Sequence, residues 1–365
     1  MNTAEALIGL NLIGGLGSAR LSGLLEYFSA PEDIFAARTD KLIQFGLPAK
    51  TAQAIAAFDF SKLQAEISSA GKLGLRIITL FDKDYPQQLK DISGAPIALY
   101  CLGGLTKEDA CSIAIVGSRR ASVYGLNSAF KFAADLAQSG ITVVSGLARG
   151  VDTYAHRGAL KAGGRTLAVL GSGFNRLYPP ENKALAEEIS RHGAVLSEFP
   201  LDTEPQRQNF PRRNRLISGL SLGVLVAEAA KNSGALITAD FALEQGREVF
   251  ALPGRIDSFT STGTNAIIQQ GAKLVTACAD ILEELFLPLE RARSQSAAVR
   301  APAQENLLFD KTQAKLYHCI GESAVSIDDL VEKTELSPAQ LSGLLLDLRL
   351  GKLIKELPGK FFVRN

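Results

Sequence analysis

The sequence predicts an α/β fold built on a doubly wound, mainly parallel β-sheet. Short apolar runs such as "SIAIVG", "ITVVSGL", "TLAVLG", "GVLVAEA" and "EVFALPG" recur along the middle of the chain. Most are separated by stretches of helical length, for example residues 127–139 and 182–192. Continuous β-branched runs that alternate with helices are typical of strands covered on both faces. In such sheets a ligand binds beyond the carboxyl ends of the strands.

A helical domain is predicted before the sheet domain, with the boundary between residues 1–65 and 66–287. Both "LNLIGGLGSARLSGLLEYF" (10–28) and "LIQFGLPAKTAQAIAAF" (42–58) have the pattern helix, tight turn, helix. The pattern resembles the helix-hairpin-helix, or SAM-like, motif, in which amides at a helix N-terminus meet a backbone phosphate. A small helical bundle without DNA contact explains the same glycines equally well.

A linker and a third domain are predicted after the sheet. Residues 288–310 lack periodicity and are rich in Ala, Ser, Pro, Gln and Arg, which indicates a linker. Residues 311–365 have the rhythm of a winged helix and end in the hairpin "LIKELPGKFFVR". The charged residues of the expected recognition helix, 338–350, are only Asp347 and Arg349. Major-groove readers usually present Arg, Lys, Asn or Gln, so a structural or protein-contact role is favoured.

Composition limits the classes of function. With 39 Lys and Arg against 38 Asp and Glu, the net charge is +1, so any nucleic-acid surface must be a local patch. The four cysteines are scattered, which argues against a zinc site or a disulfide framework. The first residues lack the pattern of a signal peptide, and no apolar run reaches the ~18 residues of a membrane span. We therefore expect a cytoplasmic protein without a membrane span.

Cations and small residues follow nearly every predicted strand, as in "GSRR" (117–120), "SGLARG" (145–150) and "KNSG" (231–234). Glycine and serine let backbone amides approach an anion, and helix N-termini add partial positive charge. Because the carboxyl ends of parallel strands meet at one edge, these cations should converge on an anion site. The residues expected there are Arg119, Arg149, Lys183, Arg212, Arg213, Arg215 and Lys231.

Fingerprints of cofactor-dependent enzymes are missing. The sequence has no GxGxxG after the first strand, no Walker pattern and no GxSxG elbow, so we expect no cofactor. Asp152 and His156, four residues apart, are candidates for acid/base chemistry, but Asp152 is more simply a helix N-cap. A structural or binding role is also favoured over catalysis for the remaining candidates, Glu198, Glu228, Asp240 and Glu244.

The sequence resembles the bacterial DNA-processing protein A family (DprA, also called Smf). The resemblance spans the chain and is carried by "IAIVGSRRASVYG", "VVSGLARGVDTYAH", "LAVLGSGFNRLYPPENKAL", "FPRRNRLISGLS" and "STGTNAIIQQGAKLV". It implies an extended Rossmann-like central domain between the helical domain and the winged helix. It also implies a homodimer that works without a cofactor. Such a protein binds single-stranded DNA during natural transformation and recombination, protects incoming strands and loads RecA recombinase onto them.

The resemblance also implies particular contacts. Carried over by position, the DNA-binding residues are Gly117, Ser118, Arg119, Asn182, Lys183, Arg212, Arg213, Asn214, Arg215 and Lys231. In "TNAIIQQGAKLV", Ile268 and Leu274 are our candidates for the dimer and recombinase contacts. Single strands also need aromatic surfaces for their bases. For Phe210, base contact and core packing are equally expected, whereas core packing is favoured for Phe174.

Two other hypotheses compete with DNA binding. A phosphoribohydrolase of the same Rossmann-like superfamily would carry "PGGxGTxxE" where this chain has "NSGALITADFALE", in which only the glutamate position survives, as Glu244. A purely structural scaffold is disfavoured because it has no need of clustered arginines. We expect the arginines to divide their roles, some facing phosphate and at least one pairing with Glu198 or Glu228.

Overall fold

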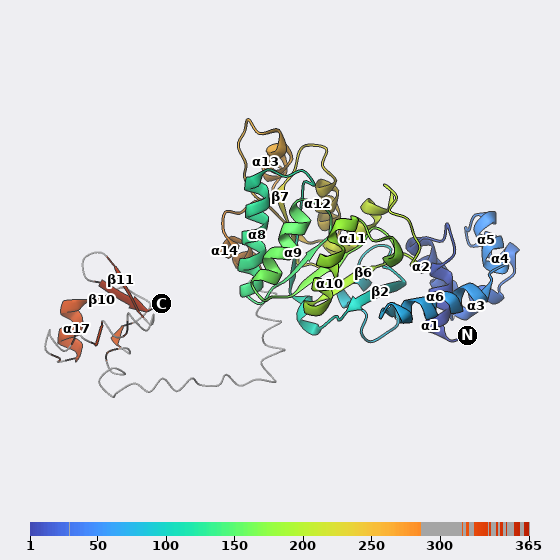
Figure 1. Cartoon of the computed structure of the whole chain (residues 1–365), viewed down its shortest axis with the longest axis horizontal. Helices are drawn as coiled ribbons and strands as arrows, with labels where there is room; N and C mark the ends of the chain where they lie inside the picture. Colours follow the sequence, from blue (N-terminus) through green and yellow to red (C-terminus); the bar gives the residue numbers. More distant parts are fainter. Residues whose placement is uncertain are drawn as a thin grey trace. The chain divides into compact units, whose positions relative to one another are not determined.

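The computed structural model forms two compact units, Met1–Gln295 and Ser296–Asn365 (Figure 1). It describes residues 1–285 except Ser29, and 316, 319–320, 325–334, 336, 341, 344–345, 348, 354–357 and 361–364. The predicted linker, 288–310, therefore lies outside the described residues, as do Asp347 and Arg349.

The first unit contains a nine-stranded sheet with the order β1-β2-β6-β5-β4-β3-β7-β8-β9. The strands are β1 (Arg76–Thr79), β2 (Ala98–Gly103), β3 (Ser112–Gly117), β4 (Thr142–Ser145), β5 (Thr166–Val169), β6 (Ala194–Ser197), β7 (Gly223–Glu228), β8 (Glu248–Ala251) and β9 (Lys273–Leu274). All neighbouring pairs from β6 to β9 are parallel, while β1 pairs antiparallel with β2, and β2 pairs antiparallel with β6. The predicted α/β fold with a doubly wound, mainly parallel sheet is confirmed.

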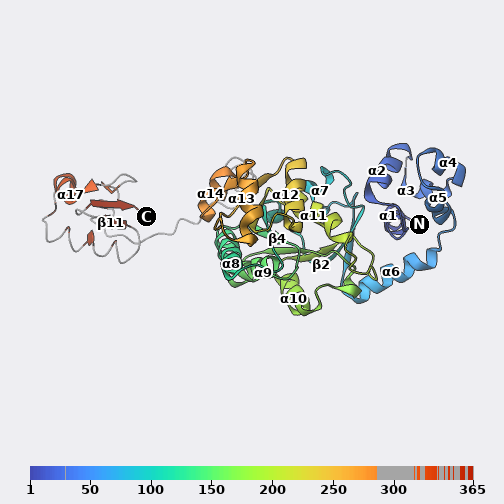
Figure 2. The same ribbon diagram turned by 90° about the horizontal axis from the view of Figure 1, so that it is seen from above.

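Helices cover both faces of this sheet (Figure 2). One face carries α8 (Val123–Gln138), α9 (Val151–Lys161), α10 (Lys183–His192) and α14 (Cys278–Glu284). The other face carries α7 (Gln87–Lys90), α11 (Asn209–Gly219) and α12 (Gly234–Glu244), while α13 (Thr262–Gln269) precedes the edge strand β9. Alternate residues of each central strand enter the two cores, because successive side chains of a strand point to opposite faces. In β3, for example, Ile113 and Ile115 pack on one face, and Ala114 and Val116 on the other.

The chain reverses its direction of travel across the sheet between β3 and β7. From β3 it moves outward through β4 and β5 to β6, and α11 then returns it to β7 on the other side of β3. This is a topological switch point, and ligands of open α/β sheets bind outside the strand ends at such points.

The helical domain precedes β1 and forms both predicted hairpins. Its helices are α1 (Thr3–Asn11), α2 (Ser18–Tyr27), α3 (Pro31–Ala36), α4 (Thr39–Gln44), α5 (Ala49–Ala56) and α6 (Phe60–Lys72). Gly15 and Gly46, both with positive φ, make the turns between α1 and α2 and between α4 and α5. These helices enclose their own apolar core, which Ile97 from the sheet domain also joins. The predicted boundary at residue 65 falls inside α6.

Two polar contacts join the helical domain to the loop after β6. The Asn11 Nδ2 donates to the Glu198 carbonyl at 3.1 Å. The Glu66 Oε1 accepts from the Leu201 amide at 2.9 Å and from the Tyr100 hydroxyl at 2.8 Å. This loop is therefore held from the helical side as well as by the sheet.

The second unit contains a three-stranded antiparallel sheet with the order β10-β12-β11 and the helix α17 (Ile327–Thr334). The hairpin of β11 (Ile354–Leu357) and β12 (Phe361–Arg364) is the predicted wing, and β10 is Val325–Ser326. Leu341, Leu345 and Leu348, from the expected recognition helix, are buried in its core. This part of the chain has the predicted winged-helix elements.

Candidate nucleic-acid interface

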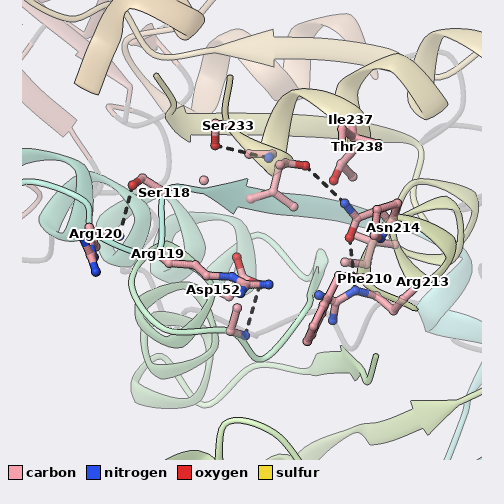
Figure 3. A pocket seen from close by; sticks show the side chains of 17 residues that line it. Ser118, Arg119, Arg120, Asp152, Phe210, Arg213, Asn214, Ser233, Ile237 and Thr238 are labelled. Carbon is pink, nitrogen blue, oxygen red and sulfur yellow. Dashed lines mark hydrogen bonds between the residues drawn. The ribbon is translucent and has the colours of Figure 1, made fainter. Parts of the chain in front are cut away.

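A cavity of about 380 Å³ lies where β3 ends and α12 begins, at the switch point of the sheet (Figure 3). Its walls come from the loop after β3, the first turns of α11 and the start of α12. The lining residues with polar or aromatic side chains are Ser118, Arg119, Arg120, Asp152, Phe210, Arg213, Asn214, Ser233 and Thr238. We call this space the switch cavity.

A second space of about 190 Å³ shares Arg119, Arg120, Ala148 and Phe210 with the switch cavity. Its remaining walls are Gly146, Arg149 and Tyr178, from the loops after β4 and β5. The ends of β3, β4 and β5 therefore open on one continuous surface, as the sequence predicted for strand-end loops.

Arginine side chains stack on aromatic rings at this surface. The Arg119 guanidinium lies 4.7 Å from the Phe210 ring centroid, and Figure 3 shows it reaching between Asp152 and Phe210. The Phe210 and Tyr178 rings are 6.0 Å apart, and the Arg149 guanidinium is 5.9 Å from the Tyr178 ring. Such cation–π contacts hold a guanidinium in place while leaving its N–H groups available to an anion. Phe174 instead packs on the apolar core, as expected.

Arg149 and Arg212 are both exposed. Arg149 pairs with Glu181, and this ion pair raises the pKa of the guanidinium. Because more than half of the Arg149 side chain is open to solvent, the pair contributes little to stability and a phosphate can displace it. Arg212 lies 5.2 Å from the ring of buried Phe199, on the first turn of α11.

Arg213 is buried, whereas its neighbour Arg212 is exposed to solvent. Its Nη1 donates to the Gly146 carbonyl at 2.5 Å and to the Val169 carbonyl, so the guanidinium links the ends of β4 and β5. Burial lowers the pKa of Arg213 to about 10, an effect opposed by the nearby Asp152 carboxylate. A Cβ on Gly146 would lie 2.5 Å from this Nη1, so only glycine leaves room for the guanidinium there.

Arg215 is the arginine that pairs with a glutamate. Its Nη2 lies 2.5 Å from the Glu198 Oε2, and the two side chains are 13% and 4% exposed. Glu228, the other predicted partner, instead accepts hydrogen bonds from the amide and hydroxyl of Ser122 at the start of α8. The division of roles in "PRRNR" is therefore visible: one arginine faces outward, one clamps carbonyls and one pairs with a carboxylate.

The two predicted asparagines are buried, and each holds backbone. Asn182 Nδ2 donates to the Leu147 carbonyl at 2.8 Å and to Thr153 Oγ1 at 2.9 Å. Leu147 has a φ of 56°, a strained value for a residue with a side chain, so this contact helps to fix the loop after β4. Asn214 accepts from the Arg213 Nε at 3.2 Å and donates to the Gly234 carbonyl at 3.2 Å, which connects α11 to the start of α12.

The remaining predicted residues lie at the surface or at the mouth of the switch cavity. Lys183 and Lys231 are exposed, at the start of α10 and after β7. Gly117 and Ser118 line the switch cavity, and Ser118 Oγ accepts from the Arg120 amide at 3.1 Å. The proposed partner residues are separate from this site: Ile268 is half-buried on α13, and Leu274 is exposed on the edge strand β9.

The expectation that Asp152 caps its own helix is wrong. Gly150 is the N-cap of α9, and the Asp152 Oδ2 accepts from the amides of Gly146 and Ala148, because the loop after β4 folds over the start of the helix. Burial raises the pKa of Asp152, and Arg213 and the two amides oppose this shift. His156 is also fully buried, and burial lowers its pKa to about 3.

The carboxylates give little support to catalysis. Asp152 is the only acidic side chain among the described residues that line the switch cavity. Glu244 is the last residue of α12, about 15 Å along the helix from the end that meets the cavity. Within the described ranges, no three His, Cys, Asp or Glu side chains are grouped to hold a metal ion.

No described helix is long and apolar enough to cross a membrane.

Comparisons with known proteins identify the family. Residues 76–286 match the model of DNA recombination-mediator protein A, and residues 296–360 match the DprA winged helix domain. Protein Smf of Escherichia coli (strain K12) is 39% identical over 322 residues, which cover 88% of this chain and 86% of that protein. The chain belongs to the DNA recombination-mediator protein A family.

Two solved structures of the family resemble this chain. The X-ray structure of DNA processing protein A from Streptococcus pneumoniae has a TM-score of 0.69 at 36% identity and covers 78% of this chain and 99% of its own. A structure of the Helicobacter pylori protein, described by its single-stranded DNA binding mode, has a TM-score of 0.53 at 30% identity. It covers 58% of this chain and 97% of its own.

Three polar lining residues of the switch cavity were singled out from the sequence neither as DNA contacts nor as acid/base candidates: Arg120, Ser233 and Thr238. Arg120 follows Arg119 in "GSRR", so the pair of adjacent arginines after the strand could have indicated it. Ser233 caps α12 through the Ala235 amide at 3.3 Å, and Thr238 lies one turn further on. Their position depends on how α12 meets β3, which local sequence does not show.

Proposed function

We propose that this chain binds single-stranded DNA across the carboxyl end of its parallel sheet. The observation that carries the proposal is the row of arginines stacked on aromatic rings, beside a cavity at the switch point. Exposed Arg119, Arg149 and Arg212 supply charge for phosphates, while Phe210 and Tyr178 supply ring faces. Binding of single strands requires this combination of cations and stacking surfaces.

The eleven predicted DNA residues fall into two groups in this proposal. Direct contacts come from Gly117, Ser118, Arg119, Arg149, Lys183, Arg212 and Lys231, which lie at the surface or line the switch cavity. Asn182, Arg213, Asn214 and Arg215 hold the loops and α11 from beneath. The protein would thus recognise phosphate and base stacking without reading sequence.

The role that we infer is that of a recombination mediator in natural transformation. The family description and the single-stranded DNA binding of the Helicobacter pylori relative support it. We include in the proposal protection of incoming strands, loading of RecA recombinase in the cytoplasm, and a homodimer that uses Ile268 and Leu274. The protein would do this by binding alone, without a cofactor or catalytic step.

The test measures binding of fluorophore-labelled oligo-dT and of a duplex of the same length by anisotropy at several salt concentrations. We expect tighter binding to the single strand and a clear loss for the double variant Arg119→Ala/Arg212→Ala. Each lost phosphate contact should reduce the slope of log affinity against log salt by about 0.7. Arg191→Ala is the matched control, because Arg191 is exposed at the last turn of α10, away from the strand ends. Equal binding by the double variant and the wild type would exclude the proposal.

The hydrolase alternative has its own test. Incubating the protein with nucleoside monophosphates should release no free base, because Glu244 is remote from the switch cavity. Release of base that depends on Glu244 would reinstate the enzymatic hypothesis.

A further inference from the structure

The most exposed large apolar side chains gather at the same end of the sheet as the switch cavity. Among the described residues they are Ile256, Phe259 and Val123, which are 97%, 76% and 74% exposed. Val123 begins α8 after β3, and the other two lie on residues 252–261, which we call the β8 loop. Exposed apolar residues that cluster in this way mark a contact surface.

The β8 loop is held by hydrogen bonds at both of its ends. The Tyr124 hydroxyl, beside Val123, donates to the Pro253 carbonyl at 3.0 Å. The Asn265 side chain exchanges two hydrogen bonds with the backbone of Gly254, at 3.1 and 3.0 Å. Thr262 Oγ1 donates to the Phe259 carbonyl at 2.8 Å. A surface ordered in advance loses little conformational entropy when it binds a partner.

Cations border this apolar surface. Arg120 and Lys231 are exposed, and the Lys231 amide donates to Thr262 Oγ1 at 3.2 Å, which places it at the end of the β8 loop. Arg255, on the loop, forms an exposed ion pair with Asp257 that a phosphate can displace. The surface therefore has the charge that suits a polyanion.

The surface also continues from the switch cavity. β8 is two strands from β3 in the sheet order, a separation of about 10 Å at the strand ends. Arg120 belongs to both places, since it lines the cavity and lies three residues before Val123. A strand that occupies the switch cavity needs only a few more nucleotides to reach the tip of the β8 loop.

We infer that the bases of a single strand leaving the switch cavity stack on Phe259 and Tyr124, beside Ile256. Arg120 and Lys231 then lie at the phosphates of these nucleotides. The inference rests on the proposed function and adds a second subsite to it. Its chemistry is aromatic stacking, which is independent of base identity.

The experiment compares two labelled strands of equal length, oligo-dT and an abasic deoxyribose-phosphate strand, both long enough to extend beyond the switch cavity. Phe259→Ala should weaken oligo-dT binding by about fivefold or more. It should leave abasic-strand binding unchanged, because only bases stack. Phe259→Tyr should bind oligo-dT as the wild type does. Leu243→Ala is the control for loss of an exposed apolar side chain, since Leu243 lies near the far end of α12.

Three results would overturn the subsite. One is unchanged oligo-dT binding by Phe259→Ala, and another is an equal loss on both strands. The third is a shift of Phe259→Ala from dimer to monomer in sedimentation with unchanged affinity per protomer, which would assign the surface to a second copy of the chain. Arg212→Ala separates this inference from the proposed function, because it should weaken binding of both strands whatever Phe259 does.

Discussion

Neighbouring arginines on α11 should respond to substitution in opposite ways. Arg212→Ala should leave the fold intact and weaken binding of single-stranded DNA, because Arg212 is exposed and its guanidinium stacks on Phe199. Arg213→Ala should instead destabilise the protein, because its buried guanidinium joins the Gly146 and Val169 carbonyls. The pair therefore separates binding from stability within two adjacent residues.

The expected size of the Arg213 effect follows from its partners. A buried carbonyl that loses its donor costs about 1–3 kcal/mol. Two carbonyls, of Gly146 and Val169, lose this donor, and the buried Asp152 carboxylate loses a nearby positive charge that lowers its pKa. These costs overlap, so we expect a loss of about 3–5 kcal/mol in the free energy of unfolding. In a protein of this size, that loss lowers Tm by about 10 °C. Arg212→Ala should change the free energy of unfolding by less than about 0.5 kcal/mol.

Melting followed by circular dichroism and anisotropy titrations over a range of salt concentrations would measure both effects. Arg191→Ala serves as the control for losing one exposed positive charge. The reasoning from burial is refuted if Arg213→Ala melts with the wild type, or if Arg212→Ala lowers Tm as much as Arg213→Ala does. An unchanged salt slope for Arg212→Ala would remove that residue from the DNA contacts.

Three further predictions concern the groups beneath the surface. Glu198→Gln leaves Arg215 without its carboxylate and should reduce the free energy of unfolding by about 3 kcal/mol in denaturant titrations; an unchanged midpoint would contradict the buried pair. The pKa of His156 is about 3 in the folded state, below its ordinary value of about 6.5. The neutral imidazole therefore makes its full contribution to the free energy of unfolding above pH ~6.5, and this contribution declines as the pH falls toward 3. His156→Gln should flatten that pH dependence in melting experiments, and an identical pH profile would count against it. Asn182→Ala removes the contacts that hold Leu147, so faster amide exchange in this loop is expected, and wild-type exchange would show that Asn182 does not hold it.

The sheet could be predicted from the sequence because its signal is local. Runs such as "SIAIVG" and "GVLVAEA" are apolar throughout, and strands β3 and β7 are indeed buried along nearly their whole length. Parallel strands share one carboxyl end, so the gathering of the loops also followed from the pattern. The elements that carry the candidate site were therefore predictable.

The roles of individual side chains were not predictable, because distant backbone decides them. Successive residues of α11 differ by about 100° around the helix, so Arg212, Arg213 and Arg215 necessarily point in different directions. Which direction is buried depends on the Gly146 and Val169 carbonyls, which are far away in sequence. The N-cap assigned to Asp152 failed for the same reason.

The seam between the helical domain and the sheet has a practical consequence for truncation. The family match begins at residue 76, so excising everything before it looks harmless. Yet Glu66 holds the Leu201 amide, and Asn11 holds the carbonyl of Glu198, whose carboxylate pairs with Arg215 of α11. A trimmed fragment would keep every strand while loosening the support of its arginine helix. Weak DNA binding by such a fragment would reflect the loss of the contacts that Asn11 and Glu66 make with the loop after β6. It would not measure the affinity of the intact protein.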